Sequence, residues 1–358
     1  MPHRALLVLI GAVLFPMVVL AQEPALRGLD PVALCKGKEL AGLPEFKAQS
    51  GAYHYQFASE ENRAAFQGDT ARYEIQLGGA CARMGPLSGT GDAQRWHVHK
   101  ERIYIFASDQ CREGFKKRHD EYLAIDEPEP KAEPGAAAAS QALLARAVAA
   151  HGGEARLRAW RSYRHERTET KGDITEVHRL QLALPDRARV DADYMQGAKV
   201  WRYGRAMTPT ANFFVDNGPA REMSRAAQQE MARDLQHEPL LALRLLLEGK
   251  GSAVVGEQRL VHGVTVQELA FWHQGHTVHF GVDADGRVRT ARCRGRGPGL
   301  HFGAVELLFD DYQTVGGLVV PGSVRGTFDG KDAPALRERR EKVEVDSDLP
   351  ATLFQAPK

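Results

Sequence analysis

One segment of the chain is suited to staying extended, and it divides the sequence into two parts. Residues 127–139 read EPEPKAEPGAAAA, with three prolines and three glutamates before a run of alanines. Proline lacks a backbone N–H, and small or charged side chains bury little apolar area, so this stretch makes a poor core and a good tether. The 358 residues also exceed one ordinary hydrophobic core. We therefore predict a small domain over residues 26–125, a linker over 126–139 and a larger domain over 140–358.

The N-terminus carries the pattern of an export signal. Arg4 supplies positive charge, residues 5–20 are almost wholly apolar, and the small residue Ala21 follows. This order is typical of a signal peptide, and the apolar run is shorter than the ~20 residues of a membrane-spanning helix. We expect a signal peptide over residues 1–21, cleaved after about Ala21, and a periplasmic or secreted protein. Gln22 stands where a lipid-anchored protein would have cysteine, so we expect no lipid anchor.

Charge and motifs narrow the classes of function. The chain has 47 Lys and Arg against 46 Asp and Glu, a formal net charge of +1. Nucleic acids and anionic membrane surfaces favour a marked basic excess, so we expect no nucleic-acid partner. The sequence holds no G-x-S-x-G, H-E-x-x-H or G-x-G-x-x-G element in a supporting context. We therefore predict a protein that is not an enzyme.

The first domain alternates short strands and helices. Residues 53–57 (YHYQF) alternate aromatic and polar side chains, which predicts a half-buried strand, and Ser59 then precedes an acidic turn as a helix N-cap does. Residues 96–106 predict a hairpin that turns at residues 100–101, and Ser108 caps a second helix. Both units share the letters F-A-S before their helix, which indicates a weak internal repeat.

The second domain is dominated by strand patterns. Ser140 is a plausible N-cap for a first helix, and alternating apolar residues follow over most of the domain. A helical stretch over residues 220–247 interrupts the strands and splits near Pro239. Hairpin turns are predicted at Asp285–Gly286, Gly316–Gly317 and Asp329–Gly330. This pattern fits a curved antiparallel sheet with helices against its concave face.

The first domain resembles the YHS domain, a small metal-associated module of the TRASH type. The order and spacing of several segments carry the resemblance, and they cover nearly the whole domain. These segments are Gly28–Ala33 (GLDPVA), Gly51–Phe57, Ser59–Arg63, Phe66, Tyr73 and Gly78–Ala82 (GGACA). The resemblance implies a small α+β fold and a link to metal binding.

The second domain, from about residue 142 to 357, resembles the LolA/LolB-like superfamily of periplasmic lipoprotein carriers. The resemblance depends on A-A-H-G-G at residues 149–153, on D-D-Y before G-G-L-V-V-P at residues 310–321, and on the final segment 343–354. It implies an antiparallel β half-barrel with helices on its concave face and an open apolar cavity for acyl chains or another lipid-like ligand. The predicted fold class is therefore α+β: a YHS-like domain followed by this half-barrel.

Thiolate and imidazole are the ligands that Cu(I) and Zn prefer. The first domain offers Cys35, Cys81, Cys111, His97 and His99 as candidate ligands. His97 and His99 are two apart on a predicted strand and so project to one side. Compared with the metal-binding members of the YHS family, Cys111 falls at a ligand position and Cys35 is displaced from one, while alanines stand at two others. The implied cofactor is a copper or zinc ion.

Two other interpretations of these cysteines stay open. In an oxidising compartment Cys81 and Cys111 could pair as a disulfide that stabilises a small domain by about 2–4 kcal/mol. The thiols could also be inert and buried, with His97 and His99 as ordinary surface residues.

Further histidines and one cysteine lie in the second domain. His273, His276 and His279 are spaced by three, which is odd, so they do not share one strand face, and we expect ordinary exposure. Cys293 lies in the basic segment ARCRGRGPG, where neighbouring arginines could make it reactive. A buried or idle thiol is the favoured interpretation.

The apolar run over residues 240–247 has two interpretations: a helix packed into the core, or a lid over a lipid-sized cavity. Side chains that we expect to line such a cavity are Trp160, Trp201, Phe213, Phe214, Leu243, Leu246, Phe271 and Trp272.

These patterns predict a periplasmic carrier that holds an apolar, lipid-like ligand in the half-barrel, with an envelope protein as a possible further partner. The alternative is a periplasmic copper- or zinc-handling protein in which the half-barrel is a scaffold.

Overall fold

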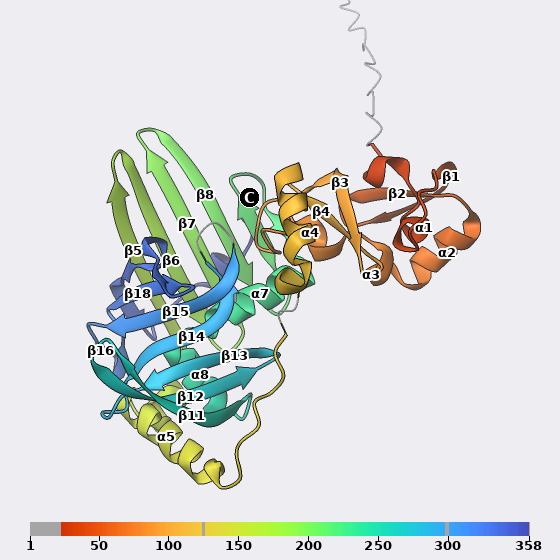
Figure 1. Ribbon diagram of the computed structural model, residues 1–358. Helices are drawn as coiled ribbons and strands as arrows, with labels where there is room; N and C mark the ends of the chain where they lie inside the picture. Colours follow the sequence, from red (N-terminus) through yellow and green to blue (C-terminus); the bar gives the residue numbers. More distant parts are fainter. Residues whose placement is uncertain (1–22, 124–125, 298–300, 358) are drawn as a thin grey trace, which may run out of the picture.

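The computed structural model describes residues 23–123, 126–297 and 301–357 (Figure 1). The predicted signal peptide lies outside the described residues. No helix in the described part of the chain has the length and apolar character needed to cross a bilayer. A small first domain and a larger second domain follow one another along the chain, as Figure 1 shows.

The first domain consists of two hairpins, each followed by a helix. Its elements are η1 Ala25–Gly28, α1 Pro31–Cys35, β1 Leu43–Ser50, β2 Tyr53–Phe57, α2 Glu60–Gly68, α3 Thr70–Tyr73, η2 Gln76–Gly79, β3 Asp92–His99, β4 Arg102–Phe106 and α4 Asp109–Leu123. The predicted caps are confirmed, because the hydroxyls of Ser59 and Ser108 accept hydrogen bonds from the N–H groups of Asn62 and Cys111. The predicted turn at residues 100–101 is also confirmed, with both residues in the left-handed region.

The segment GLDPVA (residues 28–33) has a structural role through Asp30. This carboxylate is fully buried and accepts hydrogen bonds from the N–H groups of Val32 and Ala33, which begin α1. Its second oxygen accepts from the N–H of Ala58 and the side-chain amide of Asn62. One buried charge with four donors therefore fixes the N-terminal segment against the β2–α2 connection, without any need for a metal ion.

The second domain is mainly antiparallel sheet. Its elements are α5 Ala136–Ala150, α6 Glu154–Ala159, β5 Ser162–Lys171, β6 Ile174–Ala183, β7 Arg187–Gln196, β8 Lys199–Met207, β9 Phe213–Asp216, β10 Arg221–Glu222, α7 Arg225–Leu235, α8 Pro239–Leu247, β11 Ser252–Val261, β12 Val264–His273, β13 His276–Val282, β14 Val288–Arg296, β15 Phe302–Asp310, β16 Gln313–Val315, β17 Leu318–Val320, β18 Ser323–Phe328, β19 Lys331–Asp332, η4 Pro334–Leu336, β20 Glu338–Arg339, β21 Glu341–Val345 and η5 Ala351–Phe354. The predicted turns at residues 285–286, 316–317 and 329–330 each join two strands, and Pro239 begins α8 as expected.

The strands form two main sheets. Sheet A has seven strands in the order β10-β9-β8-β7-β6-β5-β21. Sheet B has the order β11-β12-β13-β14-β15-β18-β19, with β20 also paired to β18. Only Arg340 separates β20 of sheet B from β21 of sheet A, so the chain passes directly from one sheet to the other at this residue.

The helices of the second domain pack into one hydrophobic core with both sheets. Buried side chains of α5, α7 and α8 belong to the same hydrophobic core as residues of both sheets. Leu243 of α8, Leu182 of sheet A and Phe271 of sheet B are members of this core. Burial of such side chains contributes about 1.5–3 kcal/mol each, which makes this core the main source of the domain's stability.

The C-terminal end of the predicted linker is helical, and its N-terminal end is bound to the β12–β13 hairpin. α5 begins at Ala136, inside the expected tether, and Ser140 is not its N-cap but an internal residue that donates to the carbonyl of Ala136. Alanine has the highest helix propensity of any residue type, which explains why α5 begins earlier than expected. Glu127 is bound to the β12–β13 hairpin: its N–H donates to Gly275 O at 2.8 Å and its carboxylate accepts from the N–H of Thr277 at 3.0 Å.

Candidate functional site

A hollow lies between sheet A and α7, and we call it the inner hollow. Its volume is about 210 Å³. Its lining residues are His165, His178, Arg179, Leu180, Val190, Arg205, Met231, Asp234, Leu235, Glu238 and Glu338. Apolar and charged side chains are thus combined in one site.

Strand register explains which sheet residues line the inner hollow. His165 on β5 pairs with Leu180 on β6, Leu180 pairs with Val190 on β7, and Val190 pairs with Arg205 on β8. These four residues form one row across four strands and therefore share a face. α7 covers the row with Met231, Asp234 and Leu235, which lie at helical spacing on one side of the helix.

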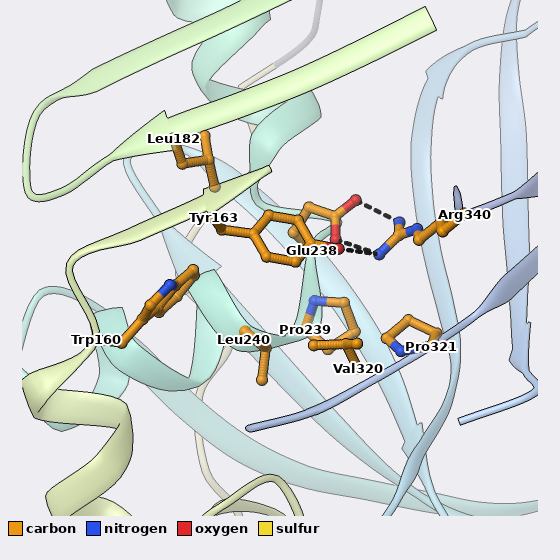
Figure 2. A pocket seen from close by; sticks show the side chains of 9 residues that line it. All are labelled: Trp160, Tyr163, Leu182, Glu238, Pro239, Leu240, Val320, Pro321 and Arg340. Carbon is orange, nitrogen blue, oxygen red and sulfur yellow. Dashed lines mark hydrogen bonds and ion pairs between the residues drawn. The ribbon is translucent and has the colours of Figure 1, made fainter. Parts of the chain in front are cut away.

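A buried ionic cluster closes one end of the inner hollow, at the joint between the sheets. Arg340, with 3% of its side chain exposed, donates to both carboxylate oxygens of Glu238 at 2.9 and 2.6 Å. It also donates to Glu338 at 2.8 Å and to the Tyr163 hydroxyl at 3.3 Å (Figure 2 shows Arg340 with Glu238 and Tyr163). Glu338 in turn lies 3.0 Å from His165.

The electrostatics of this cluster favour the charged form of its carboxylates. Burial would raise the pKa of Glu338, but the charge of Arg340 and the hydrogen bond from His165 hold it well below its usual value. Burial raises the pKa of the Tyr163 hydroxyl, so it stays protonated. Because Glu238 is the residue just before α8, the cluster fixes the start of α8 to the joint between the sheets.

The interior beside this cluster is filled with side chains. The pocket in Figure 2 is bordered by Trp160, Leu182 and Leu240 together with the Arg340 cluster, and its volume is about 10 Å³. A cavity needs roughly 10–15 Å³ to hold one water molecule. This region is therefore core and offers no room for an acyl chain in the present arrangement.

The eight residues that we expected to line a lipid cavity do not surround a common space. Trp160, Leu243 and Phe271 are buried in the main core, and Phe213 is buried in a separate small cluster. The other four, Trp201, Phe214, Leu246 and Trp272, are half-buried. Phe213 and Phe214 are neighbours on one strand, as are Phe271 and Trp272, so each pair is divided between the two faces of its sheet.

The candidate metal ligands of the first domain are also divided. Cys35 belongs to one buried cluster, with Tyr55 and Phe57, whereas Cys81 and Cys111 belong to another. His99 stacks against His119, with ring centroids 3.7 Å apart. These five predicted ligands therefore do not fit one metal ion in this arrangement, and the copper or zinc assignment stays a prediction.

Cys81 and Cys111 are the two predicted ligands that lie together. A hydrogen bond joins their thiols. Burial raises the pKa of Cys81, whereas hydrogen bonds from Ser108, Arg83 and Cys81 outweigh burial and lower the pKa of Cys111. Both thiols are free and buried here, and the predicted disulfide stays a prediction.

In the second domain, the prediction of an exposed His276 is wrong. His273 and His276 pair across the tight β12–β13 turn, and His276 is only 3% exposed. Cys293 lies on β14 and is buried as well. His237, which the sequence did not single out, follows α7 and lies against both. The letters HQGH at residues 273–276 could have predicted the pairing of His273 with His276, because a two-residue turn places its flanking residues opposite each other.

The two domains meet at Arg296 on β14. Its guanidinium donates to Glu230 on α7 at 3.0 Å and to the carbonyl of Arg83 in the first domain at 3.2 Å. Burial raises the pKa of Glu230 to about 7, against the opposing charge of Arg296. Ser224 at the start of α7 approaches Leu77 O at 3.5 Å, so the first domain rests on α7, the helix that covers the inner hollow.

No family model and no curated protein matches the sequence. Among solved structures, a domain from Vibrio parahaemolyticus described as an outer membrane lipoprotein-sorting protein aligns with 60% of this chain and 97% of its own, at 12% identity and a TM-score of 0.40. A DUF1329 family protein from Desulfovibrio piger aligns over the same shares at 11% identity and a TM-score of 0.36. A LolA superfamily protein from Nitrosomonas europaea does so at 12% identity and a TM-score of 0.32. These values do not assign the chain to a family.

Proposed function

We propose that the second domain is a periplasmic binding protein that holds an amphiphilic, lipid-like ligand on its inner face. The observation that carries this proposal is the inner hollow itself, where an apolar floor and charged walls meet beneath one helix. A ligand with an apolar body and a polar head suits both parts of such a lining.

The apolar and the charged side chains of the inner hollow would contact different parts of the ligand. Leu180 and Val190 from sheet A, with Met231 and Leu235 from α7, offer apolar contact. Arg205 makes only a loose ion pair with Asp234, at 3.8 Å, and so has donor groups for a head group. This division favours an amphiphile over a purely apolar molecule.

The inner hollow is too small for a whole acyl chain in the present structure. Its volume of about 210 Å³ is below the roughly 300–1,000 Å³ of typical ligand pockets. Uptake of a whole acyl chain therefore requires α7 or α8 to move away from sheet A. The Arg340–Glu238 pair holds the start of α8, so we take the present structure as the closed form.

Filling the hollow tests the proposal. In Val190→Trp a large side chain enters the cross-strand row, and we expect at least a tenfold loss of affinity for a fluorescent fatty-acid analogue. Val200→Trp is the matched control, because Val200 is 43% exposed, and its affinity should equal that of the unmodified protein.

The measurement is a fluorescence titration of the chain lacking residues 1–21, with circular dichroism to verify folding. Equal binding by both variants, or no binding by the unmodified protein, would reject the inner hollow as a lipid site. In the proposed function, the first domain is an accessory module that contacts α7. An envelope protein as its partner stays a prediction. The copper- or zinc-handling alternative gains no support from the first domain, whose five candidate ligands do not converge.

A further inference from the structure

We propose that His237, His276 and Cys293 form a binding site for one soft metal ion, Cu(I) or Zn(II), inside the second domain. None of the three ligands lines the inner hollow, and none belongs to the first domain. One donor atom from each residue lies within 4.8 Å of the other two.

Three elements position the ligands. His237 lies in the short connection between α7 and α8, His276 is the first residue of β13, and Cys293 is on the neighbouring strand β14. The helix connection therefore brings one imidazole down onto a sheet that presents the second imidazole and the thiol. All three residues sit on rigid elements or on a short connection between two helices, which suits a preorganised site.

The distances match the span of a coordination sphere. Nε2 of His237 lies 3.3 Å from Nε2 of His276 and 3.1 Å from Sγ of Cys293. Metal–nitrogen bonds of about 2.0–2.1 Å and metal–sulfur bonds of about 2.3 Å place donor atoms roughly 3.3–3.8 Å apart in trigonal or tetrahedral geometry. The imidazole nitrogens need to separate by only about 0.2 Å, and Nε2 of His237 and Sγ of Cys293 by roughly 0.5–0.7 Å, for an ion to sit between the three atoms.

Hydrogen bonding alone does not satisfy this group. The Nε2 atom of His237 faces two partners, but one imidazole nitrogen offers either a single N–H or a single lone pair. It cannot make a full hydrogen bond with the second histidine and with the thiol at once. A cation at the centre resolves the conflict, because it accepts a lone pair from all three atoms.

Burial and charge favour a soft ion at this place. His276 and Cys293 are 3% and 5% exposed, so a hard ion that keeps several water ligands does not fit here. Cu(I) with one thiolate and two neutral imidazoles has no net charge, which reduces the cost of burial. Zn(II) leaves one positive charge, which the nearby carboxylate of Asp234 can balance.

Space next to the ligands provides a further coordination position. A cavity of about 30 Å³ borders His237 and His276, and Glu230, Asp234 and Arg296 also line it. A cavity needs roughly 10–15 Å³ to hold one water molecule, so this one has room for water. A water molecule as fourth ligand completes a tetrahedral Zn(II) site, whereas Cu(I) is satisfied by the three protein donors.

The second cluster of potential ligands in the described part of the chain fits a metal ion less well. It consists of His99, His119 and Asp120 on the first domain. The Asp120 side chain is 63% exposed and already bonded to Lys100 at 2.8 Å. An exposed carboxylate held by a lysine is ordinary surface chemistry.

Binding involves one proton and no change of oxidation state. The S–H bond of Cys293 breaks, its proton passes to the buffer, and a metal–sulfur bond forms. The ion is supplied as Cu(I) under anaerobic conditions, or as Zn(II), so that no reductant is needed.

The experiment titrates the chain lacking residues 1–21 with Cu(I) or Zn(II) against a chromophoric chelator. We expect one tightly bound equivalent of at least one of the two ions, and a loss of affinity of about 100-fold or more in Cys293→Ser and in His276→Asn. Cys35→Ser and the double variant Cys81→Ser/Cys111→Ser are the matched controls, and both should bind as the unmodified protein does.

X-ray absorption of the loaded unmodified protein provides a test that needs no variant. It should show one sulfur at about 2.3 Å and two nitrogens at about 2.0 Å. Absence of a bound equivalent, a coordination sphere without sulfur, or loss of the metal in the Cys81/Cys111 double variant but not in Cys293→Ser would each overturn the proposal.

Discussion

The two sheets of the second domain use their inner faces differently. Sheet B presents an almost wholly apolar face, with Leu269, Phe271, Val278 and Phe280 each at most 2% exposed. Sheet A presents a mixed row in which Leu180 and Val190 lie between His165 and Arg205. Figure 1 shows β5 to β8 extending beyond the helices. The same strand geometry thus gives a closely packed apolar core on sheet B and, on sheet A beneath α7, a hollow with a mixed lining.

We expect the largest effect on the free energy of unfolding from a substitution at the joint between the sheets, at Arg340. Arg340→Ala removes the arginine partner of the buried carboxylates of Glu238 and Glu338, and we expect a loss of about 3–5 kcal/mol in the free energy of unfolding, measured by urea denaturation. Arg164→Ala is the control, because it removes an exposed ion pair with Glu344 and should cost about 1 kcal/mol or less. Similar losses in both variants would show that the cluster at Arg340 does not connect the sheets.

A matched pair of leucines tests the difference between the inner faces directly. Leu269→Ala in sheet B opens a cavity in a closed core and should cost about 4 kcal/mol, near the upper end for such changes. Leu180→Ala in sheet A borders a space that already exists, so we expect about 2 kcal/mol. The check is urea denaturation of both variants under one condition. If Leu180→Ala costs as much as Leu269→Ala, the inner hollow is closed in solution and the comparison fails.

The outer face of sheet B gives a smaller, pH-dependent effect. Burial alone would raise the pKa of Glu268, but hydrogen bonds and charge from His279 and Arg292 lower it to about 2. A lowered carboxyl pKa stabilises the fold above the unfolded value of about 4.5, and this contribution is lost as the pH falls towards 2. We expect a loss of about 2 kcal/mol between pH 5 and pH 2, after allowance for solvent screening.

Glu268→Gln is the variant that checks this assignment. The variant should be less stable at pH 7, and its unfolding free energy should change less with pH over the same interval. A variant with the same pH profile as the unmodified protein would place the acid sensitivity elsewhere, for instance at Glu338.

Local features of both domains were predictable because short-range contacts decide them. The caps at Ser59 and Ser108 and the turn at Lys100–Glu101 involve residues no more than three apart. The order of strands and helices in the second domain also followed from alternation and turn residues. The helix start at Ala136 was missed because the alanine run was assigned to the linker on composition alone.

The sites were less predictable, because they depend on residues far apart in the chain. His237 and Cys293 are separated by 56 positions and meet only when the α7–α8 connection packs on sheet B. The aromatic residues predicted to line a cavity are buried or half-buried, but they do not surround one space. Composition does not tell which side of a curved sheet a helix covers. Cys35, likewise, is separated from Cys81 and Cys111 by the way the two hairpins pack.

The sequence by itself determined the antiparallel strands with their turns and the helix starts at Ser59 and Ser108, because these depend on local backbone preferences and on periodicity. Only the tertiary structure decided that the expected lipid cavity is largely core, that a smaller mixed hollow lies under α7, and that two histidines and a cysteine converge. The physical reason is that pockets and ligand clusters arise from the packing of side chains across elements, and strand or helix periodicity does not specify that packing.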